Sequence, residues 1–301
     1  MGAVIKETNK DKLFNVFNYI FLTLAAVVVL YPLLYIVSAS ISDPAAVNSG
    51  TMWLLPKGIT FDGYKLIFEN SDIWRGYLNT IFYTVLGTFI NLAITIPAAY
   101  ALSRRDLAGR NLFMGMFVLT MFFGGGLIPT YLVVKNLGLI DTIWAMLLPN
   151  AAAVYNIIIA RVFFEVTIPK ELEESATIDG ATNFKMFFKV ILPLSAPIIA
   201  VMALFYGVAH WNGYFNALIY LSDRNLYPLQ LVLREILVLQ EMSSQNINMS
   251  SSMAEVLHSK QQLASIIKYG VMIVSTLPII IMYPFMQRHF VKGVMIGSLK
   301  G

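Results

Sequence analysis

The chain has 301 residues, of which 57% are hydrophobic and only 13% are charged, against roughly 25% charged residues in soluble domains. Its mean hydropathy of +0.69 indicates an integral membrane protein. It contains no cysteine, which excludes disulfides, thiolate metal sites and thiol chemistry, and its net charge of +4 includes no dense Lys/Arg tract of the kind that binds nucleic acid.

Six stretches approach the roughly 20 apolar residues that cross a bilayer. They cover about 16–38, 78–102, 112–134, 143–164, 196–221 and 267–287. The first ends near Ser38-Ala39-Ser40, which has the small residues of a secretory cleavage site. Its apolar run exceeds the roughly 7–15 residues of a signal core, however, which favours a retained span. The sequence therefore predicts an all-α integral membrane protein with six transmembrane helices.

The Lys and Arg residues orient these spans. If both termini are cytoplasmic, the inside segments are the N-terminal tail, SRRDLAGR at 103–110, residues 165–195 with Arg161 at their edge, and the C-terminal tail with Arg288 at its edge. Together they hold 13 of the 21 Lys/Arg. Short loops with an excess of positive charge face the cytoplasm. We therefore expect cytoplasmic tails at 1–13 and 291–301, a transmembrane domain at 14–290, and a cytoplasmic loop at 165–195.

The loop 165–195 carries signals for two short helices. Thr167 and Pro169 suit the start of a first helix, and Gly180 suits its end because glycine adopts positive φ readily. Thr182 is then a suitable cap for a second helix. The pattern predicts a folded helix–turn–helix rather than an irregular loop.

The second helix has Phe184, Phe187, Phe188 and Ile191 at the spacing of one apolar face, with Lys185 and Lys189 on a separate stripe. Such a loop either rests on lipid headgroups or docks on a protein. The first helix is acidic, which favours a protein partner over an anionic membrane.

The loop also resembles the cytoplasmic EAA loop of ATP-binding-cassette (ABC) importer permeases. That pattern is Glu-Ala-Ala, three residues, Gly, nine residues, Ile, one residue and Leu-Pro. Ser175 and Val190 are mild departures from it, at the first Ala and the Ile. The positions that the resemblance assigns to coupling with an ATPase are Glu174, Ser175, Ala176, Asp179, Gly180, Ala181, Leu192 and Pro193.

The resemblance extends from about residue 14 to residue 301. NTIFYTVLGT at 79–88 and AYALSR at 99–104 resemble the MalG type of carbohydrate-uptake permease, and FFGGGLIPTYL at 122–132 and WNGYFNALIYL at 211–221 resemble its branch for larger oligosaccharides. FVKGVMIGSLKG at 290–301 is similar to that family's tail, which implies that Gly297, Ser298 and Leu299 contact the ATPases.

The resemblance implies a transport subunit of a bacterial cell membrane rather than an enzyme. Its partners would be a second permease chain, two ATP-binding subunits and an extracytoplasmic solute-binding protein that delivers a carbohydrate. The chain has no phosphate-binding loop, since G-I-T-F-D-G-Y at 58–64 has Tyr where Lys is required. ATP and Mg²⁺ would therefore belong to the partner chains, and this chain would carry no cofactor and no metal.

Polar residues within spans are costly in lipid and indicate a pathway. The fifth span carries His210, Trp211, Asn212, Tyr214 and Asn216, and the second carries Asn91. Aromatic rings suit the faces of sugar rings and amides suit their hydroxyls. The alternative is an interfacial aromatic belt with amides bonding neighbouring helices.

Three other functions compete with this interpretation. An ABC importer for a non-sugar solute would carry the same loop. An ion-coupled secondary transporter requires buried carboxylates, which the span interiors lack. An intramembrane enzyme requires a paired catalytic set such as HExxH, which the sequence lacks.

Overall fold

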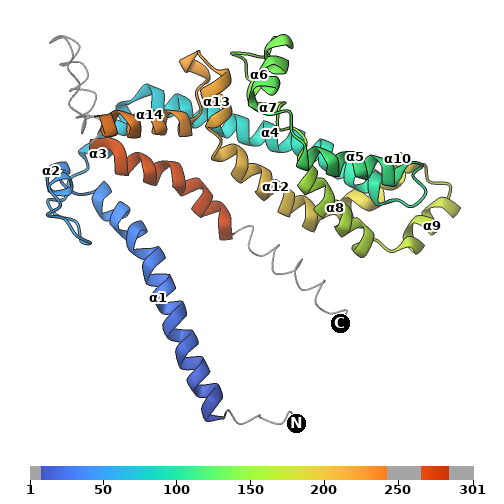
Figure 1. Cartoon of the computed structure of the whole chain (residues 1–301), viewed down its shortest axis with the longest axis horizontal. Coiled ribbons are helices and arrows are strands. Elements are labelled where there is room, and N and C mark those ends of the chain that lie inside the picture. The colour runs from blue at the N-terminus through green and yellow to red at the C-terminus, as the bar shows by residue number, and fades with distance from the viewer. Residues whose placement is uncertain (1–7, 243–265, 285–301) are drawn as a thin grey trace. The chain divides into compact units, whose positions relative to one another are not determined.

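The computed structural model describes residues 8–242 and 266–284. Within those ranges the regular structure is helical, apart from one isolated bridge between Ser42 and Ile59, so the all-α prediction is confirmed (Figure 1). The long elements are α1 (Asn9–Ser40), α4 (Ser71–Ser103), α5 (Arg110–Phe122), α6 (Leu127–Asn136), α8 (Val154–Thr167), α12 (Ala196–Trp211), α14 (Leu229–Met242) and a helix at Ile266–Pro284. Shorter helices are α2 (Pro44–Asn48), α3 (Asp62–Glu69), α7 (Trp144–Leu147), α9 (Lys170–Ile178), α10 (Asn183–Met186), η1 (Phe187–Ile191), α11 (Leu192–Leu194), α13 (Phe215–Tyr220) and η2 (Arg224–Leu226).

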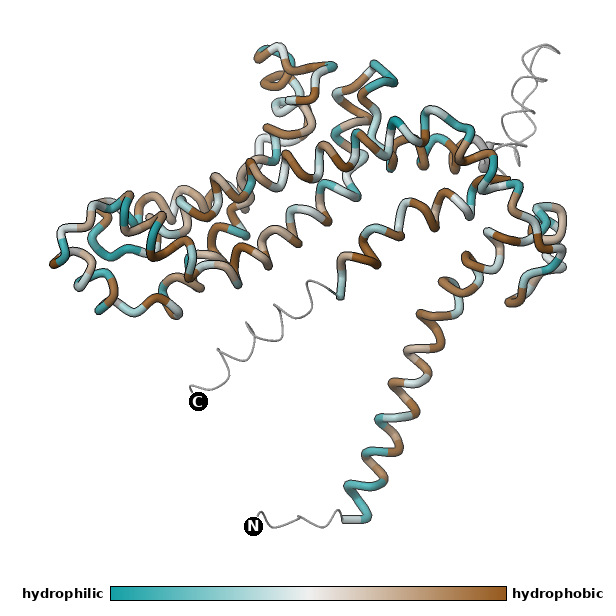
Figure 2. Tube along the Cα trace, turned by 180° about the vertical axis from the view of Figure 1, so that it is seen from behind, coloured by the Kyte–Doolittle hydropathy of each residue, from teal (hydrophilic) through white to brown (hydrophobic). Residues whose placement is uncertain are grey.

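The chain forms two compact units. The first comprises residues up to Asn70 together with Glu235–Val274, and the second comprises Ser71–Arg234 together with the chain from Ser275 onward. In the first unit, Ala39, Val47 and Met52 form a small buried cluster. Most of α1 exposes its apolar side chains, and its polar residues gather at its N-terminal end (Figure 2). An exposed apolar helix of this length suits a surrounding of lipid.

Three helices are long and apolar enough to cross a membrane, namely Asn9–Ser40, Ser71–Ser103 and Ile266–Pro284. They coincide with the first, second and sixth predicted spans. The third predicted span is bent, because α5 and α6 meet at 113°. The fifth predicted span, 196–221, comprises α12 and α13 with residues 212–214 non-helical between them, and the run Asn183–Leu194 that precedes it meets α12 at 77°. The six-span count and the cytoplasmic position of the termini stay predictions.

The fourth predicted span, 143–164, is not one continuous helix. Its residues form the four-residue helix α7 and then α8, with residues 148–153 non-helical between them. Pro149 explains the break, because proline lacks an N–H and disfavours helical geometry at the residue before it. The bend between α5 and α6 has a similar local cause, since Gly124, Gly125 and Gly126 impose no side-chain restriction and Gly126 has φ +85°.

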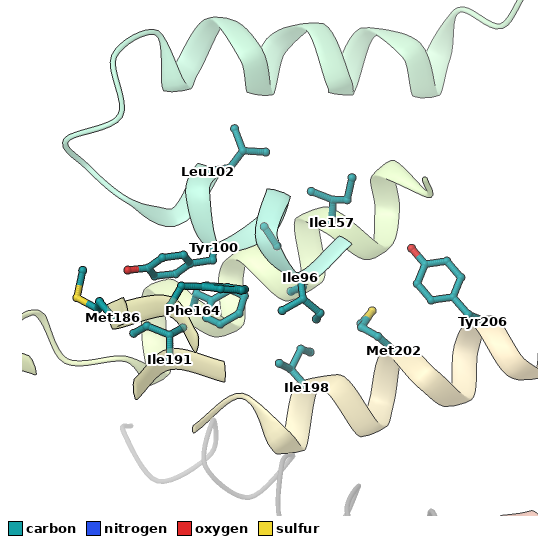
Figure 3. Packing of buried hydrophobic residues seen from close by; sticks show 13 residues of the cluster. Ile96, Tyr100, Leu102, Ile157, Phe164, Met186, Ile191, Ile198, Met202 and Tyr206 are labelled. Atoms are coloured by element: carbon teal, nitrogen blue, oxygen red, sulfur yellow. The ribbon is translucent and has the colours of Figure 1, made fainter. Parts of the chain in front are cut away.

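In the second unit, α4 packs along both α12 and α8 (Figure 1). The core between them contains Ile96 and Tyr100 of α4, Phe164 of α8 and Met202 of α12, and residues of η1 close one end (Figure 3). Tyr206 of α12 and Thr95 of α4 share a buried hydrogen bond of 2.7 Å between their hydroxyls. α4 is therefore the central helix of this unit.

Helices α4 and α12 approach closely because glycine occupies the contact. A Cβ at Gly87 would lie 2.4 Å from two ring atoms of His210. Gly207 on α12 faces Thr84 and Thr88 of α4 in the same contact. Small residues allow membrane helices to approach in this way, since apolar burial drives little association inside lipid.

We expect Gly87→Ala to lower the thermal melting temperature of the protein in mild detergent. The added methyl group has to displace the His210 ring from a packed contact, at a cost of about 1–3 kcal/mol. Gly115→Ala is the matched control, because Gly115 also lies in a helix and its added Cβ meets nothing within 4 Å. That variant should melt at or above the temperature of the original protein, since alanine favours helix by up to about 1 kcal/mol. Equal melting of both variants would contradict the packing argument.

Candidate functional site: a polar cavity and a charged loop

A cavity of about 550 Å³ lies among α4, α8, α12, α13 and the break at 148–153. This volume is within the range of small-molecule sites. The polar residues that line it are Tyr83, Asn91, Asn150, Asn156, Tyr206, His210, Asn212, Tyr214 and Asn216. Among the described residues that line it there is no Asp, Glu, Lys or Arg. The cavity is therefore rich in amide and phenol groups without a fixed formal charge.

Asn91 holds one wall of this cavity together. It is fully buried, and its Nδ2 donates to the carbonyl oxygens of Asn150 at 2.7 Å and Ala151 at 2.9 Å. Its Oδ1 lies 2.7 Å from Nε2 of His210. Because the amide nitrogen already faces two acceptors, the oxygen is the acceptor towards His210, and the network assigns the proton to Nε2. One side chain thus links α4, the helix break and α12.

The structure brings together five of the six residues predicted for the substrate path: Asn91, His210, Asn212, Tyr214 and Asn216. It also adds Tyr83, Asn150, Asn156 and Tyr206, which sequence reasoning missed. The rule that found Asn91, a polar residue inside an apolar span, would also have found Asn156. Asn150 was missed because the fourth span was predicted as one continuous helix, whereas the structure breaks that helix at 148–153.

Trp211 does not line the polar cavity. Its ring is buried, its Nε1 donates to the carbonyl of Ser275 at 2.9 Å, and it meets Tyr77 edge-to-face with 5.7 Å between ring centroids. It borders a separate apolar cavity of about 410 Å³. The structure therefore separates Trp211 from the other five predicted residues, because neighbouring residues at a helix end point in different directions.

The other end of the cavity is fixed by hydrogen bonds from α4. Tyr83 donates its hydroxyl to the carbonyl of Leu226 at 2.9 Å, and Asn79 donates to the carbonyls of Asn225 and Tyr227. Arg234 lies over the ring of Tyr214, 5.6 Å from its centroid. These contacts order the segment that follows α13.

Asp141 has a left-handed backbone conformation and binds the chain at the end of α13. It has φ +59°, which L-residues other than Gly, Asn and Asp rarely adopt. Its N–H donates to the carbonyl of Tyr220, and its Oδ1 accepts from the backbone N–H groups of Ser222 and Asp223, each at 2.8 Å. The N–H groups of Asp223 and Ser222 hold the pKa of the Asp141 carboxyl below its usual value. The carboxylate is therefore charged at neutral pH, and its stabilising contribution is lost only as the pH falls through that lowered value.

The short loop 103–110 and its ends are bound to α8 by hydrogen bonds and ion pairs. Arg161 donates to the carbonyl of Leu102 at 3.1 Å and pairs with Glu165 at 2.8 Å, and Arg110 lies 3.5 Å from the same carboxylate. Arg104 forms two hydrogen bonds with Asp106, at 2.8 and 2.6 Å. That guanidinium lowers the pKa of the Asp106 carboxyl. A cleft of about 830 Å³ opens between this loop and α9.

Tyr100 joins α4 to α9 across this cleft. Its hydroxyl donates to Oε1 of Glu173 at 3.3 Å and accepts from Nη1 of Arg104 at 3.2 Å. Its ring packs on Phe164 at a centroid distance of 5.7 Å (Figure 3). It also packs on Phe187, at a centroid distance of 5.4 Å. A single buried side chain of α4 therefore contacts α8, α9 and η1.

The loop 165–195 contains the predicted helix–turn–helix, with one boundary changed. Gly180 ends α9 with φ +70°, and Thr182 caps α10 by accepting from the N–H of Lys185 at 3.3 Å. Thr167, predicted as the first cap, is instead the last residue of α8. Residues 162–167 continue the apolar helix before them, so α8 ends only where Pro169 follows Ile168.

The residues of the EAA pattern spread over the exposed part of this loop. Glu174, Ser175, Asp179, Gly180 and Pro193 are exposed. Ala176, Ala181 and Leu192 are half-buried, and Ala176 and Leu192 pack against the core around Tyr100. The turn is closed by the N–H of Ala181, which donates to the carbonyl of Ala176 at 2.9 Å. The tail residues Gly297, Ser298 and Leu299 lie outside the described residues.

The predicted apolar face of the second helix was partly wrong. Phe187 and Ile191 are buried, together with Met186, but Phe184 is 80% exposed and Phe188 is 59% exposed. The reason is that residues 187–191 form a π-helix, in which the N–H of Leu192 donates to the carbonyl of Phe187. The wider turn separates the two pairs Phe184/Phe188 and Phe187/Ile191, and only the second pair faces the core.

We expect Asp141→Ala to lower the melting temperature more than Asp141→Gly. Both variants lose the carboxylate that accepts two backbone N–H groups, but glycine adopts positive φ without strain, whereas alanine does not. Thermal unfolding in mild detergent at neutral pH measures both variants. An alanine variant as stable as the glycine variant would contradict the strain at this residue.

Comparisons with known proteins match this architecture. The family model described as "Binding-protein-dependent transport system inner membrane component" matches residues 73–296. Protein LplC of Bacillus subtilis (strain 168) is 42% identical over 295 residues, which cover 98% of this chain and 97% of that protein. The polygalacturonan/rhamnogalacturonan transport system permease protein YtcP of the same organism is 41% identical over 292 residues, which cover 97% of this chain and 100% of that protein.

A solved structure agrees in fold as well as in sequence. It is the crystal structure of a bacterial ABC transporter involved in the import of the acidic polysaccharide alginate. The match has a TM-score of 0.84 and 35% sequence identity, and it covers 95% of this chain and 99% of that chain. The chain therefore belongs to the family of binding-protein-dependent transport system inner membrane components, the permease subunits of ABC importers.

Proposed function

We propose that the protein is the permease subunit of an ABC importer in a bacterial cell membrane, and that it forms half of the path for a sugar or oligosaccharide. A solute-binding protein delivers the substrate, a second permease chain completes the path, and two separate ATPase subunits drive it. Six spans with both termini in the cytoplasm place the charged loop 165–195 beside those ATPases. The polar cavity among α4, α8, α12 and α13 is the observation that carries this proposal beyond family membership.

The lining of the cavity supports a carbohydrate as the substrate. Amide side chains offer both donors and acceptors to hydroxyl groups, and the Tyr83, Tyr206 and Tyr214 rings add flat apolar surfaces. The similar proteins include a polygalacturonan/rhamnogalacturonan permease and an importer of alginate, which is acidic. A cavity without Asp or Glu in its described lining repels no carboxylate, so we extend the proposal to oligosaccharides that contain acidic sugars.

The coupling path runs from α9 to the cavity through α4. In this proposal the ATPase binds the exposed surface of α9 around Glu174 and Gly180, and its closure moves α9. Glu173 contacts Tyr100 of α4, and the same helix carries Tyr83 and Asn91 in the cavity wall. Movement of α9 therefore reaches the substrate path through one helix. ATP and Mg²⁺ bind the partner ATPase, and this chain supplies no residue to their chemistry.

Two alternatives remain separate candidates. An importer for a non-sugar solute has the same coupling loop, and the polar lining of the cavity argues against a wholly apolar solute. An ion-coupled transporter needs a titrating carboxylate in the membrane, and none lines this cavity in the described part of the chain.

Purification of the tagged chain from its native membrane in mild detergent tests the proposal, with mass spectrometry of everything retained. The expected result is a second permease chain, an ATPase and a solute-binding protein, and the ligand of that binding protein identifies the substrate. A neutral sugar as that ligand would overturn the acidic-sugar part alone, and a non-sugar ligand would overturn the whole substrate assignment. Recovery of this chain alone, under conditions that keep other importers intact, would overturn the ATPase-driven function.

We expect Gly180→Leu to abolish substrate uptake while membrane insertion stays normal. The substitution strains a residue at φ +70° and places a bulky side chain on the surface proposed to meet the ATPase. Gly50→Leu is the matched control, because Gly50 also has φ +70° and open surroundings but lies outside this loop. Uptake in cells and the amount of inserted protein are measured together, and normal uptake by the Gly180 variant would disprove its role in coupling.

We expect Tyr100→Phe to reduce substrate-stimulated ATP hydrolysis several-fold in the reconstituted complex. The ring keeps its packing on Phe164 and Phe187, but the hydrogen bonds with Glu173 and Arg104 are lost. Tyr155→Phe serves as the control, since Tyr155 is exposed and removal of its hydroxyl breaks no bond that the described residues show. If Tyr100→Phe and Glu173→Ala act through the same contact, their effects will not add in the double variant.

A further inference from the structure

The face of α10 and η1 opposite the core carries alternating aromatic and basic residues. Phe184, Lys185, Phe188 and Lys189, here called the aromatic–basic stripe, are all exposed. Phe184 and Phe188 expose 80% and 59% of their surface. Lys185 and Lys189 have no ion-pair or side-chain hydrogen-bond partner among residues 8–242 and 266–284. Large aromatic rings this exposed indicate a surface that is covered in the working protein.

The orientation of this helical run fits the surface of a membrane. The run Asn183–Leu194 meets α12 at 77°. Membrane-spanning helices tilt on average about 20° from the bilayer normal. A run nearly perpendicular to the span α12 therefore lies close to the membrane plane, at the height where the chain enters the bilayer.

The charge of the stripe differs from that of α9. Helix α9 carries Glu171, Glu173 and Glu174, whereas residues 183–194 contain two Lys and no acidic residue. Aromatic side chains beside Lys are typical of helices that lie in the lipid interface, and the Lys residues pair with anionic headgroups. The two halves of the loop thus differ in the partner that their charge attracts.

We propose that the aromatic–basic stripe binds the cytoplasmic membrane surface, with Phe184 and Phe188 at the level of the headgroups and Lys185 and Lys189 on anionic lipid. The stripe anchors one half of the loop, so that α9 alone moves with the ATPase. This inference rests on the proposed importer topology, which places the loop in the cytoplasm.

Because the chain has no cysteine, single nitroxide labels test the position of each side chain. The variants are Phe184→Cys, Phe188→Cys and Ile178→Cys, each assembled with cysteine-free partner subunits in nanodiscs of phosphatidylcholine and phosphatidylglycerol. Ile178 is the matched site, because it is apolar and 86% exposed but lies on the acidic helix α9. Collisions with oxygen report lipid, and collisions with a nickel chelate report water.

Labels at Phe184 and Phe188 should favour oxygen over nickel several-fold, with or without the ATPase. Two results would overturn the membrane contact. One is a label that collides more often with the nickel chelate than with oxygen, and the other is a label whose collisions with both reagents fall when the ATPase binds. The label at Ile178 tests the proposed function separately, since it should become shielded only when the ATPase binds. Shielding at Ile178 without lipid contact at Phe184 would refute the stripe and leave the importer assignment intact.

The charge of the lipid provides the second test. Substrate-stimulated ATP hydrolysis should fall at least threefold when phosphatidylglycerol is omitted, and Lys185→Glu/Lys189→Glu should remove this dependence. Lys57→Glu/Lys65→Glu makes the same change of charge at exposed lysines elsewhere and should respond to lipid as the original protein does. Equal hydrolysis by the original protein in both lipids would overturn the binding of anionic headgroups.

Discussion

The second unit depends on one buried amide. Asn91 satisfies two carbonyl groups that the broken fourth segment leaves without helical partners, and it accepts from His210 at the same time. Within a bilayer no water is available to replace these bonds, so an irregular segment persists only where protein groups satisfy it. The break in turn gives the cavity its shape, because a continuous helix at 148–153 would present side chains in place of a backbone turn.

Close packing around this amide relies on small residues rather than on apolar burial. Gly87 and Gly207 let α4 and α12 approach until the His210 ring lies against the α4 backbone. The hydroxyls of Thr84 and Thr88 are buried in this contact and have no hydrogen-bond partner among the described residues. Such groups are costly in a membrane. Both hydroxyls lie between two helices that line the cavity.

Helix α4 connects the two ends of the unit. At one end Asn79, Thr80 and Tyr83 bind the backbone of residues 225–229, and at the other end Tyr100 contacts Glu173 and Phe187. A displacement of α9 therefore has a mechanical route to the cavity and to the segment beyond it. The π-helix at 187–191 lies beside that route, and its wider turn is what separates a core-facing pair of side chains from an exposed pair.

The class of protein, the main apolar helices and the helix–turn–helix of the loop could all be predicted from the residues alone. These follow from local chemistry: apolar length defines Asn9–Ser40 and Ser71–Ser103, positive φ makes Gly180 a helix end, and Thr182 caps the helix that follows. The polar set Asn91, His210 and Asn216 was also visible, because polar groups stand out inside apolar stretches.

The directions of side chains and the positions of helix bends depend on packing between distant segments, so they could not be predicted from the sequence. Trp211 and His210 are neighbours in sequence, yet they face an apolar and a polar cavity, because helix rotation relative to α4 sets their directions. The exposure of Phe184 and Phe188 depends on a π-turn whose hydrogen-bond shift has no local signature beyond Pro193. The break at 148–153 is stabilised by Asn91, a residue some 60 positions away, so no reading of the local sequence reveals how its carbonyls are satisfied.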